Sequence, residues 1–223
     1  MVGMTTEHTF VFADLAGYTA LTETHGDDDA ARIATRFHEL ARQCLPSGTR
    51  LVKTIGDAVM VVSPTVSDGI ATAIALSREV AALPTFPALR VGLHVGSAVE
   101  RDDDYFGGTV NLAARVSAVA RGGEIVCTER IAAIAIEAGV ANARPMGTFR
   151  LKNLVSPIAL FQLTADGAAC ELCHIDPVCR MQVVPDEALA TTHAGTTLYF
   201  CSSACATKFK EAPESHLPIA SEP

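Results

Sequence analysis

Short apolar runs rich in β-forming residues alternate along the chain with longer segments whose apolar residues recur at helical spacing. The short runs predict strands at residues 8–15, 88–97, 123–128 and 159–163, which read "HTFVFADL", "ALRVGLHVGS", "GEIVCT" and "ALFQL". Between residues 50 and 63, "RLVKTI" and "AVMVVS" flank Gly56 and Asp57. A two-residue glycine turn between apolar runs is typical of a β-hairpin.

The longer segments predict three helices. Residues 27–45 begin with acids and carry apolar residues on one face, namely Ala31, Ala34, Phe37 and Leu40 or Ala41. Residues 67–83 predict a second helix with Ser67 as its N-cap, and residues 109–120 predict a third. Helices and strands that alternate around a hairpin predict an α+β fold, with helices packed on a mostly antiparallel sheet.

Composition excludes several classes of protein. The 223 residues suffice for one or two domains, and a hydrophobic content of 49% allows a packed core. The net charge of −8 gives no electrostatic reason to expect binding to nucleic acid. No segment approaches the roughly 18 apolar residues of a membrane span, and the N-terminus does not resemble a signal peptide. We therefore expect a cytoplasmic protein.

The chain divides into two regions. Residues 1–165 hold the predicted strands and helices, and small and polar residues make 166–174 a predicted linker. A cysteine-bearing module follows at residues 175–214, and residues 215–223 form a predicted tail. A module of this size buries little core, so we expect support from a metal ion or a partner.

Five of the seven cysteines lie in the last quarter of the chain. They are Cys170, Cys173, Cys179, Cys201 and Cys205. In a reducing compartment such a cluster favours a metal site over a set of disulfides. Cys44 and Cys127 have apolar neighbours and are interpreted as ordinary core residues.

Two carboxylates occupy the ends of predicted strands. Asp14 ends the first strand and Asp57 lies at the hairpin tip, so both reach one edge of the sheet if these strands are neighbours. Carboxylates in contact repel, and a divalent cation such as Mg²⁺ or Mn²⁺ removes the repulsion. The backbone that follows can present N–H groups to phosphates at a helix start, from Ala16, Gly17, Tyr18 and Thr19. The alternative is that Asp14 caps a helix and Asp57 makes the turn.

A third motif, "DDDYFGGTVNLAARV", carries polar groups on a predicted helix. Asn111 and Arg115 lie four positions apart and therefore share one face. Gly107 and Gly108 allow close backbone approach just before that helix. An amide and a fixed cation on one face suggest a site for charged oxygens. The alternative is a surface helix whose arginine pairs with exposed acids.

Three motifs in this order, "FADLAGYTAL", "KTIGDAVMV" and "DYFGGTVNLAAR", resemble the class III nucleotidyl cyclase catalytic domain. The closing "GTFRLKNLVSPIALFQL" extends the resemblance, which covers about residues 6–165. It implies a ferredoxin-like core and a head-to-tail homodimer with active sites at its interface. By position, it implies that Asp14, Asp57 and the backbone of Leu15 bind two Mg²⁺ or Mn²⁺ ions per active site. Residues 16–19 would contact the phosphates.

The other motif positions match groups that hold and activate the nucleotide. Lys53 matches the lysine that recognises the purine, and Asp104 matches its aspartate partner. This donor and acceptor fit adenine better than guanine, because guanine presents a carbonyl where adenine has its amine. Asn111 matches the asparagine that orients the ribose, and Arg115 matches the arginine that stabilises the transition state.

The cysteine-bearing module predicts a metal site. Cys179, Cys201 and Cys205 supply thiolates that converge if a helix begins near Cys201, and a soft transition metal such as Zn²⁺ or Cu⁺, or iron, would stabilise them. Residues 175–214 resemble the YHS domain, a small treble-clef-like module related to the TRASH domain. Arg180 departs from the glycine that usually follows the first cysteine in that family.

The fourth ligand of this site stays open, and the candidates are Cys173, Cys170, His174 and His193. "CELCH" also fits a c-type haem attachment pattern, which the missing export signal disfavours. The metal either holds a small fold together or adjusts the activity of the first domain through metal or redox state.

Together the resemblances predict an adenylate cyclase that converts ATP to 3′,5′-cyclic AMP and pyrophosphate. The alternatives are a non-catalytic nucleotide-binding signalling module and a guanylate cyclase. A diguanylate cyclase is disfavoured because the hairpin reads "TIGDAV" and not "GGDEF". In the implied dimer, Lys53 and Asp57 of one chain serve different active sites.

Overall fold

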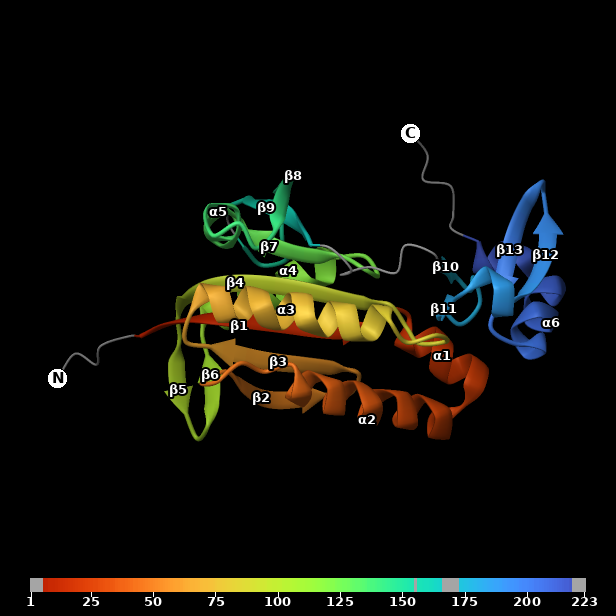
Figure 1. The fold of residues 1–223 in the computed structure, drawn as a ribbon, viewed down its shortest axis with the longest axis horizontal. Coiled ribbons are helices and arrows are strands. Elements are labelled where there is room, and N and C mark those ends of the chain that lie inside the picture. Colours follow the sequence, from red (N-terminus) through yellow and green to blue (C-terminus); the bar gives the residue numbers. More distant parts are fainter. Residues whose placement is uncertain (1–5, 155, 166–172, 218–223) are drawn as a thin grey trace.

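The centre of the molecule is a seven-stranded sheet with the strand order β2-β3-β1-β4-β7-β9-β8 (Figure 1). This computed structural model describes residues 6–154, 156–165 and 173–217. The strands of the sheet are β1 (Glu7–Leu15), β2 (Arg50–Ile55), β3 (Ala58–Ser63), β4 (Leu89–Ser97), β7 (Ile125–Thr128), β8 (Asn142–Phe149) and β9 (Ile158–Thr164). Every neighbouring pair is antiparallel except β4 and β7, which confirms the predicted, mostly antiparallel sheet.

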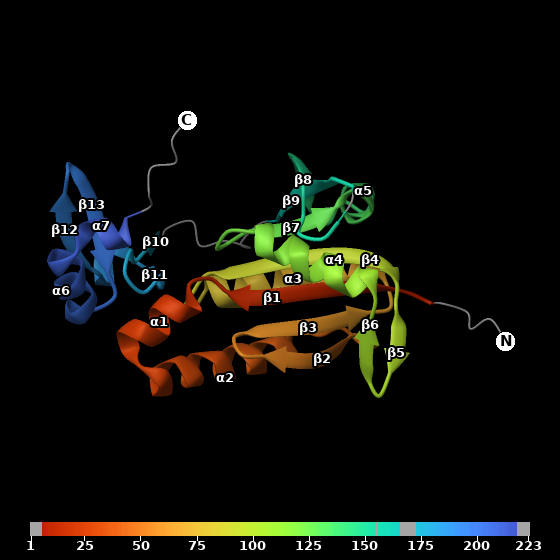
Figure 2. The same cartoon turned by 180° about the vertical axis from the view of Figure 1, so that it is seen from behind.

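Helices cover both faces of this sheet. On one face, α2 (Asp27–Gln43), α3 (Val66–Ala81) and α5 (Glu129–Glu137) enclose the main apolar core against β1, β3 and β4. On the other face lie α4 (Gly108–Val119) and a ribbon of β5 (Val99–Arg101) and β6 (Asp104–Phe106), as Figure 2 shows. The hairpin tip and the end of β1 therefore stay at an open edge between these layers.

Two helices differ in detail from the sequence prediction. In α2 Ala30 is buried and Ala31 is exposed. Phe37 and Ala41 pack in the main core against the sheet, whereas Ala30 packs in a cluster with residues of the C-terminal module. The N-cap of α3 is Thr65 and not Ser67, since the Thr65 hydroxyl accepts from the Asp68 N–H at 3.1 Å. The prediction also missed α5, β8 and the β5–β6 ribbon. It expected a helix start within residues 16–19 but gave no bounds for the helix found there, α1 (Tyr18–His25), which buries only Leu21.

The C-terminal module lies beside α1, at the corner where α1 meets α2 (Figures 1 and 2). Its elements are β10 (His174–Ile175), β11 (Gln182–Val183), the 3-10 turn η1 (Pro185–Glu187), β12 (Leu189–His193), β13 (Thr196–Phe200), α6 (Ser203–Glu211) and α7 (Pro213–His216). Leu21 and Ala30 of the first domain share one buried cluster with Val178, Phe200 and Phe209 of the module. The module therefore packs on the first domain through apolar side chains.

Two predicted segments are only partly described. Most of the predicted linker, and the predicted tail from residue 218 onward, lie outside the described residues. Within the part of the chain that is described, no helix is both long and apolar enough to cross a bilayer.

Candidate active site and candidate metal centre

Asp14 and Asp57 lie at one end of paired strands. The pairing of β1 with β3 ends at Asp14 and Ala58, and the Leu15 N–H donates to the Asp57 carbonyl at 3.3 Å. Burial raises the pKa of Asp57 above its usual value, and the charge of Asp14 raises it further, against the effect of a hydrogen bond from its own backbone. Two carboxylates whose charges repel each other in this way form a site that favours a cation.

Arg90 is the partner of Asp14, and the sequence analysis did not identify it. The two residues face each other where β1 pairs with β4. The guanidinium spans the carboxylate, with Nη2–Oδ2 at 2.5 Å and Nε–Oδ1 at 3.2 Å. Burial raises the pKa of Asp14 and the charge of Arg90 opposes that shift, with a net rise. The sheet register would have been needed to predict this pair.

The segment after β1 turns sharply into α1. Gly17 adopts a left-handed conformation with φ of 78°, which glycine accepts at low cost. The Ala16 N–H donates to the Ala88 carbonyl at 2.8 Å. Of the N–H groups predicted to contact phosphates, this one therefore already has a hydrogen-bond partner within the chain. Tyr18 begins α1, which places the next N–H groups at a helix N-terminus.

Lys53 and Asp104, for which the resemblance implied purine recognition, meet within one chain. The Lys53 Nζ donates to both carboxylate oxygens of Asp104, at 2.8 and 2.6 Å. This hydrogen bond lowers the pKa of Asp104. The Phe106 ring lies 5.9 Å from the ammonium group. Among the described residues, no hydrogen bond or ion pair joins Lys53 to Asp57.

Asn111 and Arg115 lie on α4, whose position is set by glycines. Asn111 is exposed and Arg115 is half-buried. Gly107 precedes the helix with φ of 136°. At Gly92 in β4, an added Cβ would overlap the backbone of Ser117, so α4 packs directly on the strand. This close packing fixes the height of α4, and thus of both polar side chains, above the sheet.

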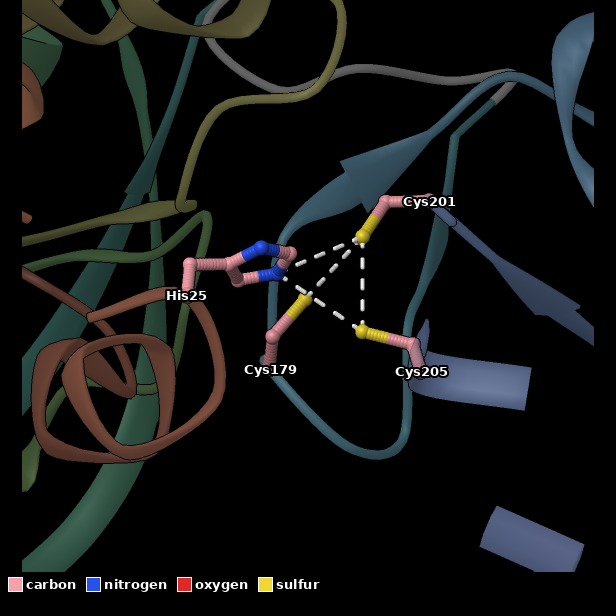
Figure 3. Close-up of side chains that lie close together, drawn as sticks. All are labelled: His25, Cys179, Cys201 and Cys205. Atoms are coloured by element: carbon pink, nitrogen blue, oxygen red, sulfur yellow. Dashed lines mark hydrogen bonds between the residues drawn. The ribbon is translucent and has the colours of Figure 1, made fainter. Parts of the chain in front are cut away.

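Three cysteines and one histidine form a compact cluster (Figure 3). The distance between the sulfur atoms is 3.4 Å for Cys179 and Cys201 and 3.5 Å for Cys201 and Cys205. The His25 Nε2 lies 3.6 Å from the sulfur atoms of both Cys201 and Cys205. All four ligand atoms lie within 4.8 Å of one another, which is a suitable arrangement for a metal ion.

The candidates named from the sequence for a fourth ligand lie elsewhere. Cys173 is disulfide-bonded, and Cys170 lies outside the described residues. His174 is exposed and stacks on Tyr199, and His193 packs edge-on against Phe209. His25 ends α1, far upstream in the sequence, and no local spacing pattern connects it to the cysteines.

Asp176 holds the cysteine-bearing loops together. This buried carboxylate accepts from the N–H groups of Val178 and Cys179 through Oδ1, at 2.8 and 3.3 Å, and from the Cys201 N–H through Oδ2, at 2.8 Å. Arg180, the departure from the expected glycine, adopts φ of 65°, a conformation that favours glycine. The turn keeps its geometry despite the substitution.

Hydrogen bonds between the thiols shift the pKa values of Cys179 and Cys205 in opposite directions. Hydrogen bonds with Cys179 and Cys201 hold the pKa of Cys205 far below the usual thiol range. The hydrogen bonds with Cys201 and Cys205, and then burial, raise the pKa of Cys179. Thiolate character at one sulfur is the starting condition for a metal ligand.

Comparisons with known proteins agree with this architecture. Residues 3–154 match the family described as the adenylate and guanylate cyclase catalytic domain, and residues 174–219 match the YHS domain. The α+β fold with its mostly antiparallel sheet is that of a class III nucleotidyl cyclase. The chain belongs to the adenylate and guanylate cyclase catalytic domain family and carries a YHS domain at its C-terminal end.

Named relatives give the range of the similarity. The chain is 35% identical to the pH-sensitive adenylate cyclase MT1302 of Mycobacterium tuberculosis over 158 residues, which is 70% of this chain and 40% of that protein. It is 38% identical to an adenylate cyclase of Glutamicibacter nicotianae over 116 residues, 52% of this chain and 29% of that protein. The matches therefore span well under half the length of these relatives.

A solved structure extends the comparison to the fold. The crystal structure of an adenylate/guanylate cyclase/hydrolase from Silicibacter pomeroyi superposes with a TM-score of 0.62 at 27% identity. The match covers 72% of this chain and 97% of that one. The match therefore covers nearly the full length of the solved structure.

Proposed function

We propose that this protein is an adenylate cyclase that converts ATP to 3′,5′-cyclic AMP and pyrophosphate. The observation that carries the proposal is the Lys53–Asp104 pair, held at 2.6 to 2.8 Å between β2 of the main sheet and β6 of the ribbon. An ammonium donor beside a carboxylate acceptor matches a ring nitrogen beside the exocyclic amine of adenine. Guanine would set a carbonyl against the carboxylate, and a polar mismatch of this kind discriminates strongly.

The residues at the end of β1 fit a pair of Mg²⁺ or Mn²⁺ ions. Asp14 and Asp57 provide carboxylates on adjacent strand ends, and the Leu15 backbone carbonyl would provide a further oxygen. Arg90 contacts both carboxylate oxygens of Asp14, so a metal ion bound there would share this carboxylate with the guanidinium. Bound there, the metal ions would acidify the ribose 3′-hydroxyl and offset the charge of the triphosphate.

The protein's own groups position the nucleotide and stabilise developing charge. The N–H groups of Gly17, Tyr18 and Thr19, at the start of α1, would contact the phosphates, with Ala16 beside them. Asn111 would orient the ribose, and Arg115 would neutralise the charge that develops at the α-phosphate. Holding the 3′-oxygen in line with the α-phosphorus is worth several orders of magnitude in rate.

We propose a head-to-tail homodimer as the active form. Exposed apolar side chains surround the Lys53–Asp104 pair: Ile55 is 53% exposed, Val99 57% and Phe106 52%. Such side chains on one surface are typical of an interface. In this arrangement the carboxylates of one chain complete the site that holds the purine pair of the other.

We propose that the C-terminal module binds a soft transition metal such as Zn²⁺ or Cu⁺ through Cys179, Cys201 and Cys205. The Cys201 sulfur lies 3.4 Å from that of Cys179 and 3.5 Å from that of Cys205, and a soft cation would stabilise thiolates placed this closely. The domain limits at residues 165 and 175, and the cytoplasmic location, stay predictions.

The function is tested by incubating the purified chain with ATP or GTP and Mn²⁺ and quantifying the cyclic products. We expect cyclic AMP from ATP, and a much lower rate with GTP. Turnover of GTP at an equal or higher rate would favour the guanylate cyclase alternative. A protein that binds ATP but forms no cyclic product at any concentration would be a nucleotide-binding signalling module instead.

A further inference from the structure

We propose that His25 is the fourth ligand of the cysteine site, so that one metal ion bridges the cyclase domain and the YHS module. Three ligands, Cys179, Cys201 and Cys205, come from the module, and the fourth comes from the last residue of α1. Figure 3 shows the imidazole pointing out of the cyclase domain toward the three sulfur atoms. The metal would therefore fasten the two domains to each other.

The distances match a tetrahedral site. Zinc–sulfur bonds of about 2.3 Å and zinc–nitrogen bonds of about 2.0–2.1 Å give tetrahedron edges of about 3.8 Å between sulfurs and about 3.6 Å between nitrogen and sulfur. The observed sulfur pairs lie at 3.4 and 3.5 Å, and the His25 Nε2 lies 3.6 Å from two of the sulfurs. A disulfide would need a separation of about 2.05 Å, so the cysteines are free thiols placed as ligands.

The surroundings of the cluster support a built site. Cys179 and Cys205 are fully buried, and Cys201 and His25 are partly buried. Asp176 holds the loops of Cys179 and Cys201 through three backbone N–H groups, and the Ser202 hydroxyl accepts from the Cys205 N–H at 3.3 Å. Ligands whose backbones are fixed in this way lose little entropy when they bind a metal.

The interface around His25 keeps the imidazole in place. Leu21, four residues earlier on α1, packs in the same buried cluster as Cys179 and Cys205. The Lys208 ammonium donates to the Glu23 carbonyl at 3.1 Å, near the C-terminal end of α1. These contacts hold α1 against the module, so that its last residue faces the three thiols.

The bridge reaches the nucleotide site through α1. This helix begins directly after Gly17, in the proposed phosphate-binding segment, and ends at His25. An eight-residue helix spans about 12 Å, so the metal and the phosphate donors occupy opposite ends of one rigid element. This part of the inference rests on the proposed function, because only the proposed function assigns phosphate binding to residues 16–19.

A second path of contacts runs from the same cysteine loop. The side chain of Arg180 covers Gly17, where an added Cβ would overlap the Cβ and Cγ of that arginine. Next along the loop, the Gln182 N–H donates to the Phe86 carbonyl at 2.9 Å. Ala88, in the same segment as Phe86, accepts from the Ala16 N–H at 2.8 Å. Metal binding in the module thus holds the phosphate-binding segment from both sides.

The metal site is tested on the full chain by metal analysis and Co²⁺ substitution, which do not depend on cyclase activity. We expect one Zn²⁺ per chain after reconstitution, and a Co²⁺ absorption spectrum of tetrahedral thiolate coordination. In His25→Ala the metal affinity should fall by about 10- to 100-fold or more, and the spectrum should change. His25→Cys should restore the affinity with a spectrum shifted toward four sulfur ligands. His174→Ala, an exposed histidine of the module, should match the wild type.

The bridge itself is tested by hydrogen exchange of the α1 amides. In the wild type, removal of Zn²⁺ by a chelator should speed exchange across residues 18–25, and Zn²⁺ should restore protection. In His25→Ala the addition of Zn²⁺ should leave α1 exchange unchanged. The proposal is overturned if His25→Ala keeps the wild-type affinity and Co²⁺ spectrum, or if Zn²⁺ protects α1 equally in both proteins. Failure of cyclic AMP synthesis alone would leave these readouts intact and would count against the proposed function only.

Discussion

Lys53 on β2 donates to both carboxylate oxygens of Asp104 on β6, at 2.8 and 2.6 Å. The side chains stay 35% and 29% exposed, and a partly exposed pair of this kind contributes only about 0–1 kcal/mol to stability. An adenine base can therefore insert and take over these hydrogen bonds at small cost. The contact holds both side chains in place before a nucleotide binds, which is a form of preorganisation.

Substitution of either member should lower catalysis with ATP. We expect Lys53→Ala and Asp104→Ala each to reduce kcat/KM by about 10- to 150-fold, because a hydrogen bond to a charged group is worth about 1.5–3 kcal/mol. The preference for ATP over GTP should shrink in both. Initial rates with each nucleotide measure this effect. Arg144→Ala, which removes an exposed contact with Gln162 at the opposite edge of the sheet, serves as the control and should keep wild-type rates.

Most strands of the sheet could be predicted from the sequence because they depend on local patterns. Short apolar runs indicated β1, the hairpin and β4, whereas the pairing of Lys53 with Asp104 was implied by the resemblance, in which the spacing to Asn111 selects Asp104 among three consecutive aspartates. The cap of α3 was misplaced by two residues, since Thr65 and Ser67 are equally good caps and only the start of the helix decides between them.

Contacts between distant segments could not be predicted. The Asp14–Arg90 pair depends on the register of β1 against β4, and no single-strand pattern contains that register. His25 joins three cysteines that lie more than 150 residues later, because the module packs on α1. The sequence predicted only the start of α1 and not its extent, because the helix is short and buries only Leu21, which leaves little hydrophobic periodicity.

Complementation between inactive variants should reveal a shared site. Asp57→Ala would remove a proposed metal-binding carboxylate, so its homodimer should be nearly inactive. Lys53→Ala would remove the proposed purine donor, so its homodimer should keep at most about a tenth of wild-type activity at low ATP concentration. If each site takes the carboxylates from one chain and the purine pair from the other, a mixed dimer keeps one intact site. We expect the mixture to regain up to about a quarter of wild-type activity per chain when the chains pair at random, since half of the dimers are mixed and each has one site. Continued inactivity, with mixed dimers demonstrated by mass spectrometry, would contradict the shared site.

Acid should remove the divalent metal at a pH above the usual range of aspartate. Burial raises the pKa of both Asp14 and Asp57, and each must be ionised to bind a cation. Mn²⁺ affinity should therefore be highest at neutral pH and fall as the pH drops through these raised pKa values. The fall should begin at a pH above 3.8, the ordinary pKa of aspartate. In Arg90→Met the fall should begin at higher pH, because the guanidinium opposes the rise at Asp14. Mn²⁺ binding followed by electron paramagnetic resonance measures both curves.

His38 could produce a similar acid effect and needs its own control. Its Nε2 lies 3.0 Å from the Gly56 carbonyl, at the hairpin tip beside Asp57, and it gains charge as the pH falls. His38→Gln removes that charge and keeps a hydrogen-bonding group. An unchanged acid fall in His38→Gln would assign the effect to the carboxylates, whereas its loss would assign the effect to the imidazole.

Gly17 and Arg180 should show energetic coupling across the domain interface. Gly17→Ala introduces a Cβ at φ of 78° that would overlap the Arg180 side chain. The backbone strain alone costs about 1–2 kcal/mol, and the overlap adds a second penalty. Arg180→Gly removes the overlap and also relaxes the arginine's own left-handed backbone. In the double variant we therefore expect only the strain at residue 17 to remain, so that the two changes are not additive in the free energy of unfolding.

Arg180→Ala is the matched comparison for this double-mutant cycle, because it shortens the same side chain but keeps a Cβ at φ of 65°. It should be less stable than Arg180→Gly by about 1 kcal/mol, measured by denaturant unfolding of Zn²⁺-loaded protein. Arg180→Ala should rescue Gly17→Ala less than Arg180→Gly does, because alanine keeps the Cβ, which would lie 2.3 Å from the new methyl group. If the effects of Gly17→Ala and Arg180→Gly on the free energy of unfolding are additive, Arg180 does not contact Gly17 in solution. Coupling of more than about 0.5 kcal/mol would place the arginine on Gly17 in the working protein.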